Sequence, residues 1–558
     1  MNTISMGSAL LVAIVLAPHG YSQCQRQKLL AADGQRSDKF GFSVAISGDW
    51  ASVASPSRSD QVNGSGAVYI FQWTGSTWVQ TQKLKANDAS FGATFGFSIA
   101  MSGTVLVIGA PDDLGVGATY VFELVGSTWT QTAKLNVSNP NSGDEFGTRV
   151  ATTGDRILMS APGDDQHGQD AGAAYVFDRV GSAWVQSAKL MGGDTVAYDG
   201  LGTVSLSGDM ALVGAPSKDG PGRAEAGAAY VFEKGMSGWT QTEKLLASDG
   251  ATYDHFGNSV AILGTRIVVG AAGHAHQSVG YAGAAYAFEY NMSAWVPTQE
   301  FWADDTVAGD FFGAASAISV DHFITYAANP GGNTGSAYDF RLSGSTWTQA
   351  GKLLAEDAAW DDVLGSWLAI DGDRVIAGAP GRDEACTNNP SCESGAAYIF
   401  QLAPTTTQYG HCPSGAPCNN TDIHGGCANS TGQGAILAAC GSGSVTTDDL
   451  QIEVTHCPAH KSTLLFMGGL QVNAPFADGI RVVGGGAPGI YRFGILQSDA
   501  NGTAMRGPGL VTQSLGFHSS GRIQAGQIWN FQVWYRDLAG PCGHLTNYSN
   551  GVQVAFAP

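Results

Sequence analysis

One unit of roughly 55 residues recurs along the first 400 residues, and this repeat constrains the fold more than any other feature. Each copy opens with Phe or Leu followed by Gly, and neighbouring openings are 51 to 56 residues apart. The seven openings are Phe40, Phe95, Phe146, Leu201, Phe256, Phe312 and Leu364. A period of this length is typical of β-propeller blades.

Two further landmarks follow each opening in a fixed order. One is Gly-Ala-Pro or a variant of it, which starts at Ala54, Gly109, Ser160, Gly214, Gly270, Ala327 and Gly378. The other is a Tyr-x-Phe that ends at Phe71, Phe122, Phe177, Phe232, Phe288, Phe340 and Phe400. Short apolar runs separated by Gly-rich turns predict four strands in each unit. We therefore expect an all-β, seven-bladed propeller.

The two ends of the repeat region predict how the ring closes. Residues Gln25 to Leu30 match the end of a fourth strand, although no first strand precedes them. The seventh unit lacks its own fourth strand after Phe400. The N-terminal strand is therefore expected to complete the last blade, which removes the exposed edges of an open array.

The Phe-Gly and Gly-Ala-Pro landmarks resemble the FG-GAP repeat of the integrin α-subunit N-terminal β-propeller and of many secreted bacterial proteins. The resemblance covers about residues 25–402 and implies a seven-bladed propeller used in adhesion or ligand binding. Integrin-type repeats commonly carry a D-x-D-x-D-G calcium loop. No copy here has that spacing, so the resemblance transfers no calcium ligand.

The remaining segments complete the expected domain organisation. The apolar run Ala9 to Ala17 has the length of a signal-peptide core and is too short to span a bilayer. We expect a signal peptide over 1–23, the propeller over 24–402, a linker over 403–411 and a smaller β-sandwich-like domain over 412–558. The end of the chain resembles β-rich modules of secreted planctomycete-type proteins.

The cysteines indicate an oxidising compartment. Of nine, eight can pair in disulfides: Cys386, Cys392, Cys412, Cys418, Cys427, Cys440, Cys457 and Cys542. Zinc binding by some of them with His411 and His424 is disfavoured, because the spacing matches no strong zinc pattern. Cys24 is left over, and lipidation of this residue is an alternative to a free thiol.

Acidic residues recur in the loops ahead of each opening. The position seven residues before is acidic in six copies, and so is the position two residues before. Five copies of the pair are complete and are candidate metal ligands: Asp33, Asp38, Asp194, Asp199, Asp249, Asp254, Asp305, Asp310, Asp357 and Asp362. Asp at such positions caps turns, whereas clustered loop oxygens suit Ca²⁺; the two roles are compatible. We also expect one strongly acidic face, and His274 and His276 are a second possible metal pair.

The overall charge limits the partners. With 47 Asp plus Glu against 27 Lys plus Arg, the chain is a poor match for nucleic acids or anionic membranes. No G-x-S-x-G, Walker loop or H-E-x-x-H motif is present, so no catalytic residue is assigned. The sequence favours a secreted or cell-surface, monomeric binding protein for an extracellular protein, glycan or cation. The alternatives are a glycan hydrolase or lyase with a site in the propeller funnel, and a structural envelope component.

Overall fold

The computed structural model describes residues 25–557 except 61, 76, 278, 329–332, 356, 385–391, 403–405, 410–411, 413–416, 418–419, 423–424, 441–442, 447, 449, 487–488 and 501. Residues 1–23, expected to be a signal peptide, and Cys24 lie outside these residues. The chain divides into two compact units at the Ala403–Pro404 boundary. None of the described helices is both long and apolar enough to cross a membrane.

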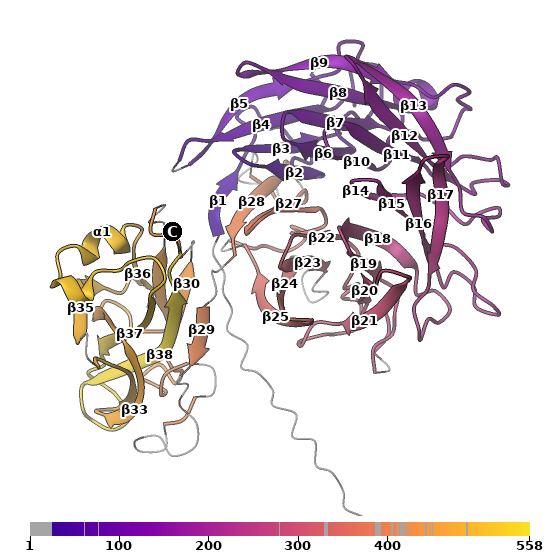
Figure 1. Cartoon of the computed structure of the whole chain (residues 1–558). Helices are drawn as coiled ribbons and strands as arrows, with labels where there is room; N and C mark the ends of the chain where they lie inside the picture. Colours follow the sequence, from indigo (N-terminus) through magenta and orange to yellow (C-terminus); the bar gives the residue numbers. More distant parts are fainter. Residues whose placement is uncertain are drawn as a thin grey trace, which may run out of the picture. The chain divides into compact units, whose positions relative to one another are not determined.

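Seven four-stranded antiparallel sheets form a ring in the first unit (Figure 1). Blade one contains β2 (Val44–Ser47), β3 (Trp50–Ser55), β4 (Ala67–Trp73) and β5 (Trp78–Leu84). Blade two contains β6 (Ser98–Ser102), β7 (Val105–Ala110), β8 (Ala118–Val125) and β9 (Thr128–Leu135). Blade three contains β10 (Val150–Thr152), β11 (Arg156–Ala161), β12 (Ala173–Val180) and β13 (Ala183–Leu190). Blade four contains β14 (Thr203–Ser207), β15 (Met210–Ala215), β16 (Ala228–Gly235) and β17 (Gly238–Leu245).

The other three blades follow the same order. Blade five contains β18 (Phe256–Leu263), β19 (Arg266–Ala271), β20 (Ala284–Tyr290) and β21 (Trp295–Phe301). Blade six contains β22 (Ser316–Ile318), β23 (His322–Ala327), β24 (Ser336–Ser343) and β25 (Thr346–Leu353). Blade seven contains β26 (Leu368–Asp371), β27 (Arg374–Ala379), β28 (Ala396–Gln401) and the N-terminal β1 (Gln25–Leu29). A short 3-10 turn, η1 (Asp113–Gly115), lies between β7 and β8.

The N-terminal strand closes the ring, as predicted. β1 pairs antiparallel with β28, placing Lys28 opposite Tyr398 and Leu29 opposite Ala397. Leu29 is buried together with Ile399 in a core shared by blades seven and one. Closure therefore rests on backbone hydrogen bonds and on apolar packing across the junction.

The repeated glycines mark the points where neighbouring blades touch. Phe95 forms a parallel bridge with Gly66 of the preceding blade, and its ring packs edge-on against Tyr120 of its own blade, with centroids 5.3 Å apart. A Cβ on Gly66 would lie 2.1 Å from the Phe95 carbonyl oxygen. Likewise, a Cβ on Gly109 would lie 1.9 Å from the carbonyl oxygen of Gly147 in the next blade. Glycine is needed at both positions because the backbones approach so closely.

One face of the ring, here called the loop face, carries the connections between blades and the loops between second and third strands. The connections span 30–43, 85–97, 136–149, 191–202, 246–255, 302–315 and 354–367, and the loops span 56–66, 111–117, 162–172, 216–227, 272–283, 328–335 and 380–395. Each connection is hydrogen-bonded to the loop of the preceding blade. For example, Tyr198 N–H donates to Gln169 O, and Phe311 N–H donates to Tyr281 O. The loop face is therefore a continuous, cross-bonded surface.

The second unit is a β-sandwich, as expected. One sheet has the order β29 (Thr406–Tyr409), β38 (Thr546–Ala555), β37 (Ile528–Arg536), β32 (Ser462–Gly468) and β35 (Ile490–Gln497). A three-stranded sheet contains β30 (Ile436–Cys440), β31 (Gln451–Thr455) and β36 (Ala504–Arg506). The hairpin β33 (Leu470–Phe476) and β34 (Gly479–Gly484), the helix α1 (Leu510–Ser514) and the 3-10 turn η3 (Ser519–Gly521) complete the unit.

The two sheets share one hydrophobic core. Ile452 and Val454 of the three-stranded sheet are buried in the same cluster as Met467, Phe531 and Val552 of the five-stranded sheet. The segment 403–411, expected to be a linker, contains the strand β29. This segment forms a strand because its backbone pairs with the C-terminal strand β38.

Of the predicted disulfide cysteines whose side chains the structure describes, four are disulfide-bonded and one is free. Cys412 and Cys427 form a disulfide, and Cys392 and Cys542 are each disulfide-bonded. Cys386, Cys418 and the side chain of Cys440 lie outside the described part of the chain. The assignment of Cys457 to a disulfide is wrong: its thiol is free and buried in the sandwich core. The prediction rested on the even count of these cysteines, and a count cannot reveal that apolar packing encloses the Cys457 side chain.

Candidate functional site

A Tyr, a Lys and an Asp recur together on the loop face of six blades. In blade four the Tyr230 hydroxyl donates to Asp194 Oδ1 at 2.7 Å, and Lys244 Nζ lies 2.6 Å from Asp194 Oδ2. Lys244 Nζ also lies 5.6 Å from the Tyr230 ring centroid, a cation–π contact. The six Lys–Asp pairs are Lys83–Asp33, Lys134–Asp88, Lys189–Asp164, Lys244–Asp194, Lys352–Asp305 and Lys28–Asp357.

The same contacts perturb the aspartates. Burial of Asp194 acts to raise its pKa, but hydrogen bonds from Lys244 and Tyr230 outweigh it, so the pKa of Asp194 is lowered. The pKa of the tyrosine rises, because burial and the neighbouring carboxylate both disfavour a phenolate. These aspartates are therefore anchored carboxylates within internal ion pairs.

The second acidic position caps a turn. In every copy where it is Asp, one carboxylate oxygen accepts a hydrogen bond from the backbone N–H three residues earlier, at 2.6 to 2.8 Å. The capping residues are Asp38, Asp144, Asp199, Asp254, Asp310 and Asp362. The predicted turn-capping role is thus present at each of them.

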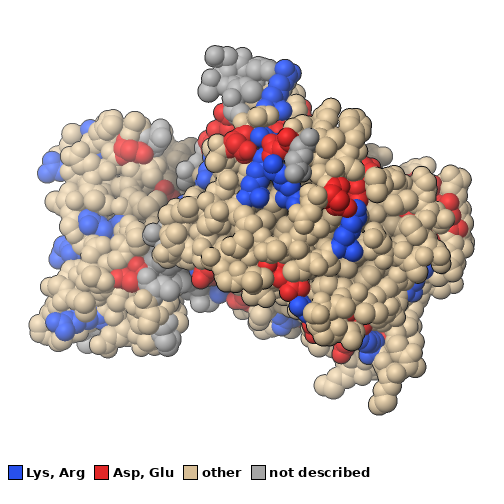
Figure 2. Space-filling model, turned by 90° about the horizontal axis from the view of Figure 1, so that it is seen from above, with Lys and Arg blue, Asp and Glu red and all other residues tan. Residues whose placement is uncertain are grey.

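Side-chain cations occupy several predicted metal positions. Arg58 donates to Asp38 at 2.5 Å and to Asp33 at 3.2 Å, so its guanidinium bridges the acidic pair of blade one. Arg382 bridges Asp357 and Asp362 in the same way in blade seven. In blade four Lys218 Nζ lies 2.9 Å from Asp199 Oδ2. In Figure 2 basic and acidic side chains accordingly adjoin one another on the visible face. The prediction of a strongly acidic face did not take these compensating cations into account.

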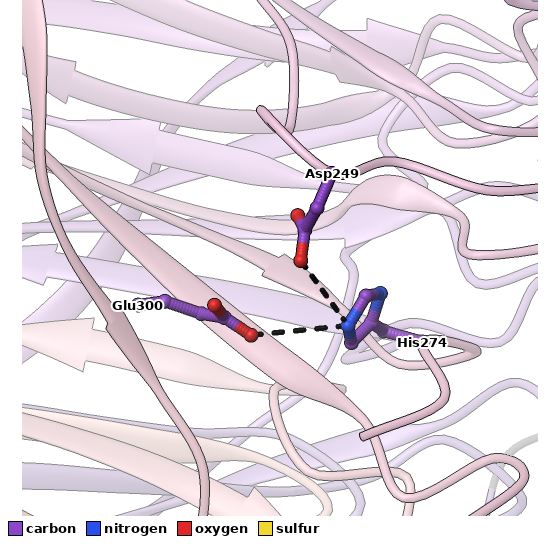
Figure 3. Close-up of side chains that lie close together, drawn as sticks. All are labelled: Asp249, His274 and Glu300. Atoms are coloured by element: carbon purple, nitrogen blue, oxygen red, sulfur yellow. Dashed lines mark ion pairs between the residues drawn. The ribbon is translucent and has the colours of Figure 1, made fainter. Parts of the chain in front are cut away.

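Blade five departs from this pattern. Tyr286 is opposite Glu300, whereas the equivalent Tyr230 is opposite Lys244. His274 Nε2 lies 3.6 Å from Asp249 Oδ2 and 3.8 Å from Glu300 Oε1, and the three side chains converge in Figure 3. Burial and the charge of Asp249 raise the pKa of Glu300. The usual ammonium group is thus replaced by a second carboxylate and an imidazole.

The two histidines singled out in the sequence do not act together. His274 Nδ1 is 2.9 Å from Asp254 Oδ2, and the ring is buried. His276 instead stacks on Trp302, with ring centroids 4.2 Å apart. His411 and His424 lie outside the described residues. Sequence reasoning missed Glu300, although comparing the Lys-Leu at the end of each fourth strand would have found it.

The central channel is a second asymmetric feature. It has a volume of about 330 Å³ and is lined by the first strands of all seven blades. The Arg149 guanidinium lies 4.6 Å from the Trp367 ring centroid, and burial lowers the pKa of Arg149 to about 10. Among the described residues that line this channel there is no Asp, Glu or His. The channel can receive an anionic group, but it offers no carboxylate or imidazole for acid–base chemistry.

Exposed aromatic side chains gather on the loop face. Trp360 is 76% exposed, Phe91 75% and Tyr198 60%. Tyr253, Tyr281 and Phe311 are also exposed, and the last two pack together with centroids 5.8 Å apart. Tyr281 and Phe311 line a pocket of about 620 Å³ between blades five and six. The opposite hairpin turns expose aliphatic residues such as Met236 and Met292.

The closed ring of seven sheets defines the first unit as a seven-bladed β-propeller. A family model for the FG-GAP repeat matches residues 24–71, 78–122, 129–177, 184–232, 239–288 and 347–400, more than half of the chain. The protein therefore belongs to the FG-GAP repeat family, as the landmarks predicted. The unmatched copy is blade six, yet it forms a complete sheet. Its Gly-Ala-Pro is expected at Ala327-Ala-Asn, but the structure aligns this landmark one residue earlier, at Tyr326-Ala327-Ala328, because Tyr326 O accepts the Gly313 N–H as Gly109 O accepts the Gly96 N–H. No curated protein is significantly similar to the chain.

Proposed function

We propose that the protein is a secreted or cell-surface binding protein whose loop face holds an extracellular protein or glycan. The gathering of exposed aromatic side chains on this face carries the proposal. Tyr and Trp supply large contact areas with few rotatable bonds, and they dominate both protein-binding hot spots and sugar-stacking surfaces. Backbone hydrogen bonds between the loops fix the backbone that carries these side chains before a partner arrives, which limits the loop entropy lost on binding.

Two properties support an extracellular setting. FG-GAP repeats are typical of extracellular proteins. Disulfide bonds at Cys412–Cys427 and at Cys392 and Cys542 persist in oxidising compartments. Both favour a role outside the cytosol.

The composition of the channel favours binding over glycan hydrolysis. Glycosidases of the usual kinds need two carboxylates on either side of the scissile bond. The described part of the channel wall provides Arg149 and Trp367 but no carboxylate. An enzyme acting there would lack its acid and its base.

An array of glycans and extracellular matrix proteins tests the proposal with the full chain. We expect a partner whose affinity falls at least tenfold in Trp360→Ala combined with Tyr253→Ala. Met236→Ala combined with Met292→Ala, on the opposite turns, is the matched control and should leave affinity unchanged. Equal losses in both double variants, or an array without any partner, would refute loop-face binding.

A further inference from the structure

The seven-fold repeat provides six internal references for blade five. In the other blades, each Tyr-bonded aspartate is paired with a lysine at the end of a fourth strand. In blade five Asp249 keeps its hydrogen bond from the Tyr286 hydroxyl, at 2.9 Å. The lysine is replaced by Glu300, and Asp249, Asp254 and Glu300 have no Lys or Arg partner among the described residues. Three carboxylates therefore share one imidazole.

The hydrogen bond at His274 Nδ1 orients Nε2 of the same ring toward the carboxylates of Asp249 and Glu300. His274 Nδ1 is hydrogen-bonded to Asp254, whose same oxygen also accepts the Ala251 N–H at 2.6 Å. This anchoring leaves Nε2 directed at Asp249 and Glu300, 3.6 and 3.8 Å away, and no described group hydrogen-bonds to it. The His274 side chain is 9% exposed, so the imidazole that directs Nε2 toward these carboxylates is more than nine-tenths buried.

The distances from His274 Nε2 to the carboxylate oxygens of Asp249 and Glu300 suit a bound ion better than direct hydrogen bonds. Distances of 3.6 and 3.8 Å are too long for hydrogen bonds. Two ligand atoms that are each about 2.0–2.1 Å from a tetrahedral ion are about 3.3–3.4 Å apart. Among the described residues, these three form the one group of His, Cys, Asp or Glu side chains whose ligand atoms all lie within 4.8 Å of one another. Asp249 and Glu300 are 46% and 29% exposed, so small rotations of these side chains would bring their oxygens to an ion.

We propose that blade five binds a divalent transition metal of the Zn²⁺ type through Asp249, His274 Nε2 and Glu300. An imidazole and two carboxylates form a donor set that zinc accepts, whereas calcium prefers oxygen ligands alone. The His274–Asp254 hydrogen bond is the carboxylate–histidine contact that orients a ligating imidazole and increases its basicity. Three protein ligands leave one position open to water or to a donor group from a partner. The site extends the function beyond aromatic contacts, and its existence does not depend on them.

The competing explanation is that His274 is an imidazolium that simply replaces the missing lysine. Its pKa is raised, chiefly by the hydrogen bond to Asp254. Metal binding and a protonated imidazole exclude each other at Nε2, so a metal titration separates them.

The decisive experiment titrates ZnCl₂ and, separately, CaCl₂ into chelator-treated full-length protein at neutral pH, using calorimetry and thermal melting. We expect one equivalent of Zn²⁺ to bind and raise the melting temperature, with no response to Ca²⁺ at this site. Glu300→Lys restores the lysine of the other blades, so it should fold normally and lose zinc affinity at least tenfold. His274→Gln should also lose it. Glu243→Lys makes the same charge change on the outer strand of blade four and is the matched control.

Zinc binding that is equal in wild type, Glu300→Lys and His274→Gln would place the metal elsewhere and overturn the proposal. Absence of zinc binding by the wild type would leave the imidazolium explanation and overturn it as well. Calcium binding that disappears in Glu300→Lys, without zinc binding, would reject the assignment to a transition metal.

Discussion

Lys28 Nζ lies 2.8 Å from Asp357 Oδ2, although the two residues are 329 positions apart in the chain. Asp357 also accepts a hydrogen bond from the Tyr398 hydroxyl at 2.9 Å. The N-terminal strand thus gives blade seven the same Tyr–Lys–Asp cluster that blades one, two, three, four and six each make within one continuous stretch of sequence. Ring closure restores the chemistry of the repeat as well as its fourth strand.

Removing β1 should open the ring. Deleting residues 1–29 leaves β28 as an unpaired edge and removes Leu29 from its core, so we expect a lower melting temperature and self-association. Calorimetry and light scattering after gel filtration measure the two effects. A deletion of residues 1–24 keeps β1 and is the control. A stable monomer without β1 would contradict its role in closure.

Alanine at Gly66 should destabilise the propeller by more than about 3 kcal/mol, because its Cβ would meet the Phe95 carbonyl oxygen. Gly75 also has a positive φ, +93°, but nothing lies within 4 Å of its Cβ position. Gly75→Ala should therefore cost only the conformational strain, about 1–2 kcal/mol. Denaturant unfolding compares the two variants. Similar losses of unfolding free energy in the two variants would mean that the contact between blades at Gly66 adds nothing to the cost of the backbone strain.

Two lysines of blade four should differ in their contribution to stability. Lys218 and Asp199 are buried, with side chains 9% and 3% exposed, so Lys218→Met should cost about 3 kcal/mol by leaving a buried carboxylate unpaired. Lys244 and Asp194 are 28% and 54% exposed, and Lys244→Met should cost less than about 1 kcal/mol. Urea titrations at neutral pH test the difference. The opposite ranking would show that burial does not set the strength of these pairs.

Acid should weaken the propeller through its anchored aspartates. The pKa of Asp194 is lowered in the folded state, so its contribution is complete above its unfolded pKa, about 3.9, and disappears as the pH falls through the folded pKa. Asp194→Asn should reduce the loss of unfolding free energy between pH 5 and pH 2. Glu243→Gln, which removes a carboxylate without a described ion-pair partner, is the control. If unfolding free energy fell equally steeply with pH in the wild type, Asp194→Asn and Glu243→Gln, the lowered pKa of Asp194 would not contribute to acid sensitivity.

The thiol of Cys457 should be unreactive in the folded protein. Burial raises its pKa to about 12, and Asp537 adds to the shift, so almost no thiolate forms at pH 8. Peptide mapping after iodoacetamide treatment should find Cys457 unmodified in native protein and alkylated in guanidinium chloride. Modification in the native state would show that the sandwich core opens readily.

The sequence predicted the propeller because its landmarks mark recurring backbone contacts. Phe95 and Gly66 have an equivalent Phe or Leu and an equivalent Gly at every junction, since each junction needs an anchoring side chain and a close backbone approach. The details of the loop face were less accessible. Alternate residues such as His274 and His276 look equivalent in a loop, yet the turn directs one to Asp254 and the other to Trp302. Glu300 escaped notice because it lies on a strand rather than in an acidic loop.

The pairing of β1 with β28 also fixes an order of events during synthesis. β1 is the first of the described strands to be translated, and its partner is the last strand of the propeller. The nascent chain must therefore carry an unpaired strand until blade seven has emerged. Until then the unpaired β1 can pair with another copy of the chain, which is the contact that a domain-swapped dimer would use.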